Sequence, residues 1–250
     1  MTDRPIIFSA PMVQALLAGR KNQTRRLLNP QPDLNDAGLW RYPPDSVCNG
    51  VDPKLWVKRF GGFCQTDAEG LASFLLHPSN GRRLLPYAPG DRLYVREAWS
   101  GEHYWHATAP KERQSGCWGG EVYVKESIWY WADGNPEFGD WERPRPSIHM
   151  PRWASRLTLI VTEVRVQRLQ EISEADAVAE GCAWSDLWEG YTPCPDAGDA
   201  RYFNSRSAAR SFEQLWSGIH GSDAWGANPW VVAVSFTVQH GNIDAGGDHG

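Results

Sequence analysis

The basic segment Gly19-Arg20-Lys21-Asn22-Gln23-Thr24-Arg25-Arg26 holds the densest set of residues that could do chemistry. Lys21 and Thr24 are three residues apart, so in a turn their side chains can point to the same side. A lysine beside a threonine hydroxyl can act as base and nucleophile if the pKa of its amine falls from about 10.4 towards neutrality. Neighbouring arginines and partial burial would lower that pKa. Composition alone also favours a plain basic loop after a helix.

The elements that must position this segment begin at the N-terminus. Pro5–Phe8 predicts a short strand, and Ser9-Ala10-Pro11 predicts a helix start, since serine caps well and proline is tolerated in a first turn. Gly19 is placed to end that helix. After the turn at Gly90-Asp91, the residues Leu93–Trp99 predict a strand that carries Glu97, a second candidate for the chemistry.

The longest strand-like stretch, Ser155–Leu169, changes its alternation. Its apolar residues share one face up to Val161, whereas Val164 and Val166 belong to the other phase, which indicates a bulge or bend near Thr162. Two strands are also expected at 121–125 and 127–131, and a closing strand at 230–238. Helices are expected at 173–181, with Ser173 as cap, and at 208–219; a short one is expected near 68–76.

These elements predict an α+β fold, a small mixed β-barrel with about three helices. A doubly wound fold is excluded by the lack of a βαβ rhythm and of a phosphate loop. Residues 29–89 and 182–205 read as two long loop insertions in a single domain over 1–239, and the glycine-rich tail 240–250 is expected to be disordered.

Composition and charge exclude several classes of protein. No apolar run reaches the roughly 18–20 residues of a membrane span, and the five cysteines form no Cys-x-x-Cys pair, which excludes a secreted disulfide framework. Residues 1–28 carry a net charge of +4, whereas residues 170–200 carry −8 and are expected to be a solvated face and loop. The net charge of −5 makes long duplex nucleic acid a poor partner. We therefore expect a cytoplasmic protein with a small ligand.

Aromatic and metal-binding patterns are less specific. Of the 14 tryptophans, Trp216 and Trp230 lie on regular apolar patterns and are expected in the core, whereas Trp99 and Trp153 are candidates for stacking on a base. The set His103-x-x-His106 with Cys117 fits no standard ligand spacing, so no metal and no cofactor is expected. His149 reads as structural, although it could line the mouth of a pocket.

The pattern Gly-x-Lys-x-x-Glu/Thr-x-Arg, following a strand and a helix, resembles the signature of the ASCH domain family. Gly19, Lys21, Thr24 and Arg26 match it, and a strand at 90–97 and a helix at 173–181 follow in a similar order. The resemblance implies a PUA-like β-barrel related to RNA-binding PUA domains. Parts of the chain also look like prophage-borne ASCH proteins, which implies the cytoplasm of a bacterial host. The two insertions lie outside a minimal barrel.

Within this family, bacterial N4-acetylcytidine amidohydrolases have Lys and Thr at these motif positions and a Glu on a later strand. Lys21, Thr24 and Glu97 resemble that trio. The resemblance implies that Lys21 takes the proton of Thr24, which attacks the acyl carbonyl, while Glu97 recognises the N4 group and helps protonate the leaving amine. Arg26 or Arg96 would support the oxyanion or the carboxylate. Alternatively, Glu97 is a structural carboxylate paired with Arg96 or Arg26.

Three functions remain open at this point. The first is an amidohydrolase that deacylates an N4-acylated cytidine nucleoside or a related modified base. The second is a module that binds RNA or a modified nucleotide without catalysis, and the third is a ribonuclease, an activity that the resemblance also implies. In each case the partner is a small nucleoside or a short RNA.

Overall fold

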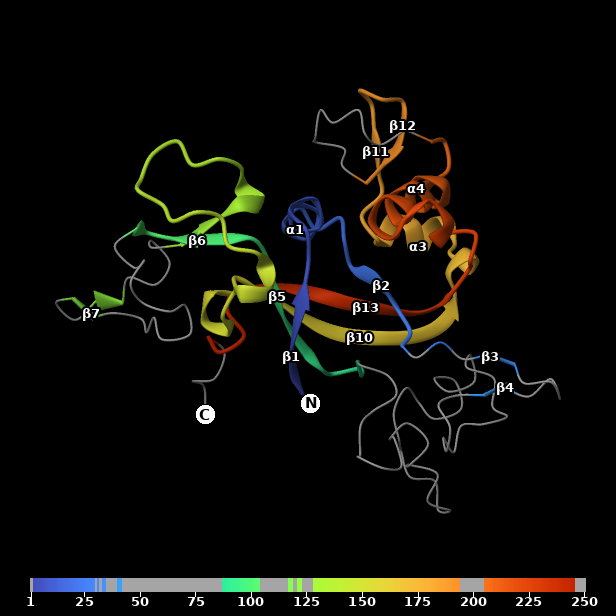
Figure 1. Cartoon of the computed structure of the whole chain (residues 1–250), viewed down its shortest axis with the longest axis horizontal. Coiled ribbons are helices and arrows are strands. Elements are labelled where there is room, and N and C mark those ends of the chain that lie inside the picture. Colours follow the sequence, from blue (N-terminus) through green and yellow to red (C-terminus); the bar gives the residue numbers. More distant parts are fainter. Residues whose placement is uncertain are drawn as a thin grey trace, which may run out of the picture. The chain divides into compact units, whose positions relative to one another are not determined.

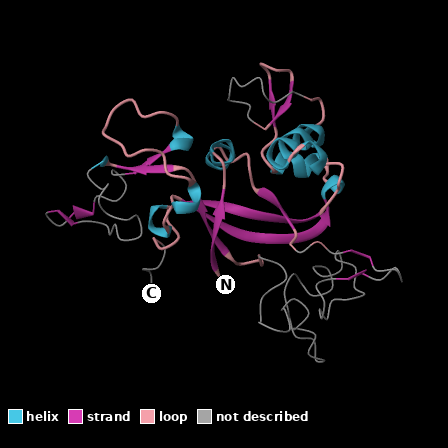
Figure 2. Ribbon diagram, viewed as in Figure 1, coloured by secondary structure: helices cyan, strands magenta, loops and turns pink. Residues whose placement is uncertain are grey.

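The computed structural model describes residues 2–29, 31, 33–34, 40–41, 87–103, 117–118, 121–122, 128–193 and 205–245. The fold is mixed α+β, as the sequence predicts (Figure 2). The chain divides into two compact units, each assembled from several segments. Unit 1 comprises Met1–Gly19, Arg92–Ile160 and Val238–Gly250; unit 2 comprises Arg20–Asp91 and Val161–Thr237.

The largest sheet has five strands in the order β1-β5-β10-β13-β2 (Figure 1). Strand β1 (Asp3–Ile7) pairs in parallel with β5 (Arg92–Arg96), and β10 (Leu157–Arg168) pairs with β5 antiparallel. Strand β13 (Trp230–His240) is antiparallel to β2 (Gln23–Leu27). The four expected strands therefore lie in one sheet, with ends shifted by a few residues. Among the described residues no sheet closes into a barrel.

The described residues also form four two-stranded sheets. They pair β3 (Asp33–Leu34) with β4 (Trp40–Arg41), β6 (Trp99–Gly101) with β9 (Ile128–Tyr130), β7 (Cys117–Trp118) with β8 (Glu121–Val122), and β11 (Ala183–Ser185) with β12 (Gly190–Thr192). The described parts of the strands expected near 121 and 128 thus pair with β7 and β6, respectively. The expected insertion 182–205 contains the hairpin β11–β12, whereas most of the insertion 29–89 lies outside the described residues.

The phase change expected in β10 is confirmed by burial. Leu157, Leu159 and Val161 are buried, then two consecutive residues, Thr162 and Glu163, are exposed, and burial resumes at Val164. Two exposed neighbours break the alternation of a regular strand. The first part of β10 consequently buries its odd-numbered apolar residues, and the last part buries its even-numbered ones.

The described α-helices are α1 (Ala10–Leu17), α3 (Glu174–Ala179) and α4 (Ala208–His220). Ser173 caps α3 as expected, because its hydroxyl accepts a hydrogen bond of 3.0 Å from the amide of Asp176. The expected helix near 68–76 lies outside the described residues. None of the described helices is long and apolar enough to span a membrane.

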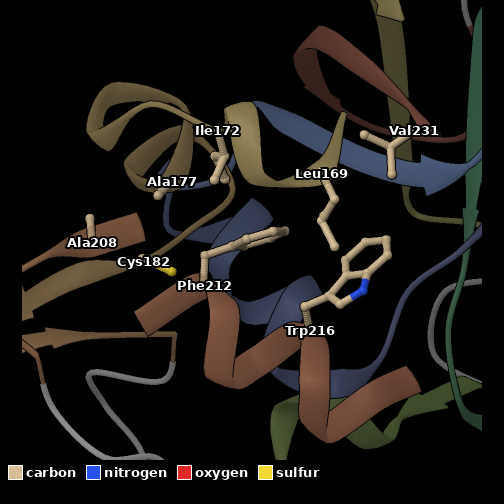
Figure 3. Packing of buried hydrophobic residues seen from close by; sticks show 8 residues of the cluster. All are labelled: Leu169, Ile172, Ala177, Cys182, Ala208, Phe212, Trp216 and Val231. Carbon is tan, nitrogen blue, oxygen red and sulfur yellow. The ribbon is translucent and has the colours of Figure 1, made fainter. Parts of the chain in front are cut away.

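The core of unit 2 forms where α3 and α4 pack against each other (Figures 2 and 3). Phe212 and Trp216, one turn apart on α4, are both buried, and their rings are in tilted contact at 6.0 Å. Trp230 of β13 is also buried, so both tryptophans expected in the core lie there. The cluster consists of Leu169, Ile172, Ala177, Cys182, Ala208, Phe212, Trp216 and Val231.

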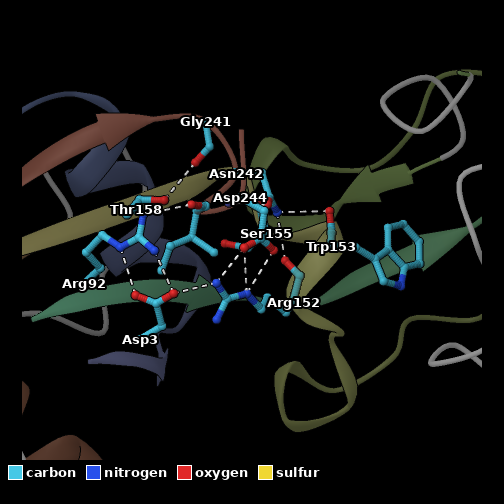
Figure 4. A network of polar contacts seen from close by, with 10 residues as sticks. Asp3, Arg92, Arg152, Trp153, Ser155, Thr158, Gly241, Asn242 and Asp244 are labelled. Atoms are coloured by element: carbon cyan, nitrogen blue, oxygen red, sulfur yellow. Dashed lines mark hydrogen bonds and ion pairs between the residues drawn. The ribbon is translucent and has the colours of Figure 1, made fainter. Parts of the chain in front are cut away.

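Unit 1 is held together by an ion network that ties its C-terminal segment to β1 and β5 (Figure 4). Asp3 accepts two hydrogen bonds from Arg92, of 2.8 and 2.7 Å, and one of 2.6 Å from Arg152, which also binds Asp244. The Asn242 amide donates to three backbone carbonyls of residues 152–155. The expected disorder of the tail therefore does not extend to residues 241–245, because these specific contacts hold them.

Burial of Trp216 predicts the stability cost of removing it. Trp216→Ala leaves a large cavity in the core of unit 2, so the free energy of unfolding, measured by urea denaturation, is expected to fall by about 3–5 kcal/mol. Trp184→Ala is the matched control, since Trp184 is 48% exposed, and its expected cost is below about 1 kcal/mol. Equal costs for both variants would contradict this description of the core.

Candidate functional site

Lys21 is buried at the entrance to β2, with a side chain that is only 1% exposed. Its ammonium donates to the backbone carbonyl and to the carboxylate of Glu180, both at 2.7 Å. The adjacent Asn22 is fixed by its backbone, which bonds to Ala179 on one side and to Phe236 on the other. Composition alone favoured a basic loop for this segment, whereas Lys21 lies in the packed interior.

Desolvation of Lys21 lowers the pKa of its amine, while the Glu180 carboxylate opposes that shift. The net direction is downward, which is the direction that a general base requires. Because the amine is held by Glu180, removing its proton also breaks an ion pair.

Glu180 and Asp176 belong to one face of α3 and its C-terminal end, because they are four residues apart. Arg25 binds both of them, Glu180 at 3.1 Å and Asp176 at 3.0 Å, and Arg165 of β10 binds Asp176 at 2.7 Å. Cations and carboxylates thus alternate from Lys21 through Glu180, Arg25 and Asp176 to Arg165. The acidic stretch 170–200 was expected to be solvated; this expectation is wrong for Glu180 and Asp176, whose charges are matched by cations distant in the sequence.

The cations of this network shift the pKa of the Asp176 carboxyl. Burial alone would raise its pKa, but the hydrogen bond from Arg165 and the charges of Arg25 and Arg165 outweigh it and lower the pKa of Asp176 to about 2. Gln23 adds a hydrogen bond of 3.2 Å. The folded state therefore strongly favours the ionised form of this carboxyl.

Thr24 lies in β2 opposite Val234 of β13 and is buried. Gln23 and Arg25, its neighbours in the strand, both turn towards Asp176 and Glu180. Side chains of a strand alternate between faces, so Thr24 and Arg26 point to the face of β2 away from α3. Lys21, bound to Glu180, has its amine on the α3 side.

In unit 1, Glu97 is buried and held by an arginine that the sequence did not suggest. It continues the buried alternation of Leu93 and Val95, and Arg156 binds its carboxylate at 2.9 and 3.0 Å. Burial raises the pKa of Glu97, although the Arg156 hydrogen bonds lower it. The sequence also allows Glu97 to be a structural carboxylate paired with Arg96 or Arg26. The observed partner is Arg156.

Arg156 links this carboxylate to the surface. Its guanidinium also binds the half-exposed Asp133, at 2.7 and 2.8 Å, and lies over the ring of Tyr130 at 4.0 Å. No short-range pattern identifies such a residue, since Arg156 and Glu97 are 59 positions apart. Only a three-dimensional arrangement could have revealed it.

The other predicted binding residues of unit 1 lie near Glu97 in the chain or around Met150. Arg96 donates to the backbone carbonyl of Ile148. Trp99 is completely buried and packs with Met150 and Ala154, and its ring meets Trp153 edge to face at 6.1 Å. Trp153 is only partly buried, so of the two tryptophans it has the more open ring.

The predicted trio is therefore distributed over both units. Lys21 and Thr24 belong to unit 2 and Glu97 belongs to unit 1. Their convergence in one pocket, and the roles of Arg26, Arg96, Trp99 and Trp153 in binding, stay predictions. The described residues contain no group of three His, Cys, Asp or Glu side chains that could hold a metal ion, and the set with His106 and Cys117 lies partly outside them.

Comparisons with known proteins add no family to this description. No protein-family model, no curated protein and no solved structure matches the chain.

The low pKa of Asp176 predicts how stability depends on pH. A carboxyl whose folded-state pKa is depressed contributes stability above its unfolded pKa of about 3.9, and this contribution is lost as the pH falls towards 2. Asp176→Asn is therefore expected to be less stable than the wild type at pH 6, by about 1–3 kcal/mol, and the difference is expected to shrink between pH 5 and pH 2. Urea denaturation at several pH values measures it.

The control for this prediction is Asp186→Asn on the surface hairpin. The Asp186 carboxylate is exposed and has no arginine partner in the part of the chain that the structure describes. Its loss should leave the free energy of unfolding nearly unchanged at pH 6. A difference between Asp176→Asn and wild type that stays constant down to pH 2 would contradict the assigned ion pairs.

Proposed function

We propose that the protein acts on a modified nucleoside, as an amidohydrolase that removes an acyl group from N4 of cytidine. The observation that carries the proposal is the burial of Lys21, because desolvation makes its amine give up a proton more easily. Lys21 follows the turn at Gly19, whose φ of 68° is in the left-handed region that favours glycine. This is the place where the ASCH resemblance expects the base. The same proposal takes the five-stranded sheet as the wall of a PUA-like barrel.

The reaction balances with the residues of the motif and water. Neutral Lys21 takes the proton of the Thr24 hydroxyl, and the oxygen attacks the acyl carbonyl. The C–N bond breaks, the proton passes from Lys21 to N4 of the leaving cytidine, and a threonine ester remains. Water then attacks the ester, with Lys21 again taking and returning a proton, so that the carboxylic acid and free Thr24 are released.

This mechanism requires a movement around Lys21. The amine must leave Glu180 and turn to the Thr24 side of β2, since the hydrogen bonds of Lys21 to Glu180 hold it on the α3 side. Lys21 and Thr24 are almost fully buried, so a substrate could reach them only if the protein also opens around them. Glu97 as the group that recognises N4 stays part of the proposal on the strength of the resemblance alone.

A second candidate function is binding of a modified nucleotide or a short RNA without catalysis. The ion pairs favour it, because Lys21 is held by Glu180 and Glu97 is held by Arg156, each at 3.0 Å or less. Charges matched in this way stabilise an interior and leave no free base or acid. A ligand would then be recognised elsewhere on the protein.

Replacing Lys21 separates the two candidates. Lys21→Arg keeps a cation beside Glu180 but removes the base, since the guanidinium does not lose its proton in proteins. We expect its kcat for N4-acetylcytidine, followed by the mass of the cytidine product, to fall at least about 100-fold. Thr24→Val should abolish turnover, and Thr24→Ser should retain part of it. Unchanged turnover in Lys21→Arg, or a wild type that binds N4-acetylcytidine without converting it, would overturn the amidohydrolase.

Two checks make the result interpretable. Thr158→Val is the matched control for Thr24→Val, because Thr158 is also a buried strand threonine; its hydroxyl donates to the carbonyl of Gly241 at 3.0 Å. It should lose some stability and no activity. Circular dichroism and urea denaturation of every variant show that the fold is retained, since Lys21 is buried and its replacement affects the packing around Glu180.

A further inference from the structure

Unit 1 contains a cavity of about 700 Å³ on the side formed by the segment 141–149. Its volume lies within the range of small-molecule sites in proteins. The lining combines one indole ring, two imidazoles, two guanidinium groups and one carboxylate; the residues are His103, Trp141, Glu142, Arg143, Pro144, Arg145, Pro146 and His149. None of them is part of the proposed amidohydrolase.

Backbone hydrogen bonds fix this wall although its sequence is that of a loop. The amide of His103 donates to Asp140 at 2.8 Å, and the amide of Glu142 donates to Gly101 at 2.9 Å. Arg145 and Trp99 exchange two backbone bonds, of 2.9 and 3.2 Å. The segment 140–145 thus lies antiparallel along β6 and its continuation, and the cavity is preformed.

Trp141 is held in one orientation at the wall. Its indole N–H donates to the carbonyl of Phe138 at 2.9 Å, and its ring contacts Trp129 with centroids 5.8 Å apart. Gly139 has a φ of 102°, and a Cβ at this position would lie 2.5 Å from the indole nitrogen. Only glycine therefore permits this placement of the ring, which is half-buried and belongs to the lining of the cavity.

The charges of the lining favour an anion. Glu142 is buried, and both of its oxygens accept from Arg145, at 3.0 and 3.1 Å, which fixes that guanidinium and neutralises the carboxylate. Arg143 is exposed and has no ion pair in the part of the chain that the structure describes. His149 is exposed on the same lining, and its imidazole N–H can donate a further hydrogen bond. Arginine pairs with phosphate through two parallel N–H groups.

We propose that this cavity binds a nucleoside phosphate, with the phosphate on Arg143 and His149 and the base on the indole of Trp141. A fixed ring beside the Arg143 guanidinium, which pairs with no described carboxylate, matches the two parts of such a ligand, a flat base and an anionic group. The ligand is either a free nucleotide or one nucleotide of a single strand, because both present the same chemistry. The inference does not depend on the amidohydrolase, since its residues and its readout are different.

Calorimetric titration with cytidine monophosphate, cytidine and inorganic phosphate tests the proposal on the full chain. The monophosphate should bind more tightly than either of its parts. Arg143→Gln should weaken binding of the monophosphate at least about fivefold, as expected for the loss of a charge-assisted contact, and leave cytidine unaffected. Arg210→Gln on α4 is the matched control, because Arg210 is likewise exposed; it should change nothing.

Trp141→Leu and a short RNA distinguish the remaining outcomes. Trp141→Leu should weaken the binding of the monophosphate and leave the affinity for inorganic phosphate unchanged. An unchanged affinity for the monophosphate would overturn the stacking role of Trp141. Tighter binding of a cytidine tetranucleotide than of the monophosphate, lost in Arg143→Gln, would identify a strand as the source, and equal binding would identify the free nucleotide. Equal affinities for cytidine and its monophosphate, or equal effects of Arg143→Gln and Arg210→Gln, would overturn the proposal.

Discussion

The packing of unit 2 depends on one buried carboxylate, Glu180, shared by Lys21 and Arg25. Burying such charges is costly, and the cost is offset only if each charge keeps partners at hydrogen-bond distance. Glu180 meets this condition with contacts of 2.7 and 3.1 Å to two cations. The carboxylate therefore fixes the end of α3 relative to β2, and with it the position of the motif that carries Lys21.

The same carboxylate limits what Lys21 can do. An ion pair in a desolvated interior favours the charged amine, whereas desolvation itself favours the neutral amine, and for Lys21 desolvation is the larger effect. The same amine thus forms a structural ion pair with Glu180 and has a pKa lowered in the direction that a general base requires. A ligand or a movement that drew Glu180 away would remove the effect that raises the pKa of Lys21, so the pKa of the amine would fall further.

Local patterns in the sequence predicted the elements well. The phase change at Thr162, the Ser173 cap and the apolar stripe of α4 each depend on residues only a few positions apart, and each is found in the structure. The partners of the charged residues were not predictable. Glu180 lies 159 positions from Lys21, and Arg156 lies 59 positions from Glu97, so no spacing rule connects them. The sequence placed Glu97 on a strand, but it did not indicate that Arg156 would be its partner.

The segment 133–146 shows that composition can hide a well-defined cavity wall. Glycine and proline there predict a loop, because neither residue supports a regular helix or strand. In the folded chain the same residues act differently: Gly139 makes room for the Trp141 indole, and Pro144 and Pro146 flank Arg145 where it bonds to Trp99. Proline restricts the backbone dihedral angles, and the backbone hydrogen bonds to β6 hold the segment in one position. A segment that is irregular in sequence can therefore form a surface with a fixed backbone. Arg143 is exposed on this surface, and its guanidinium forms no ion pair with any residue in the described part of the chain.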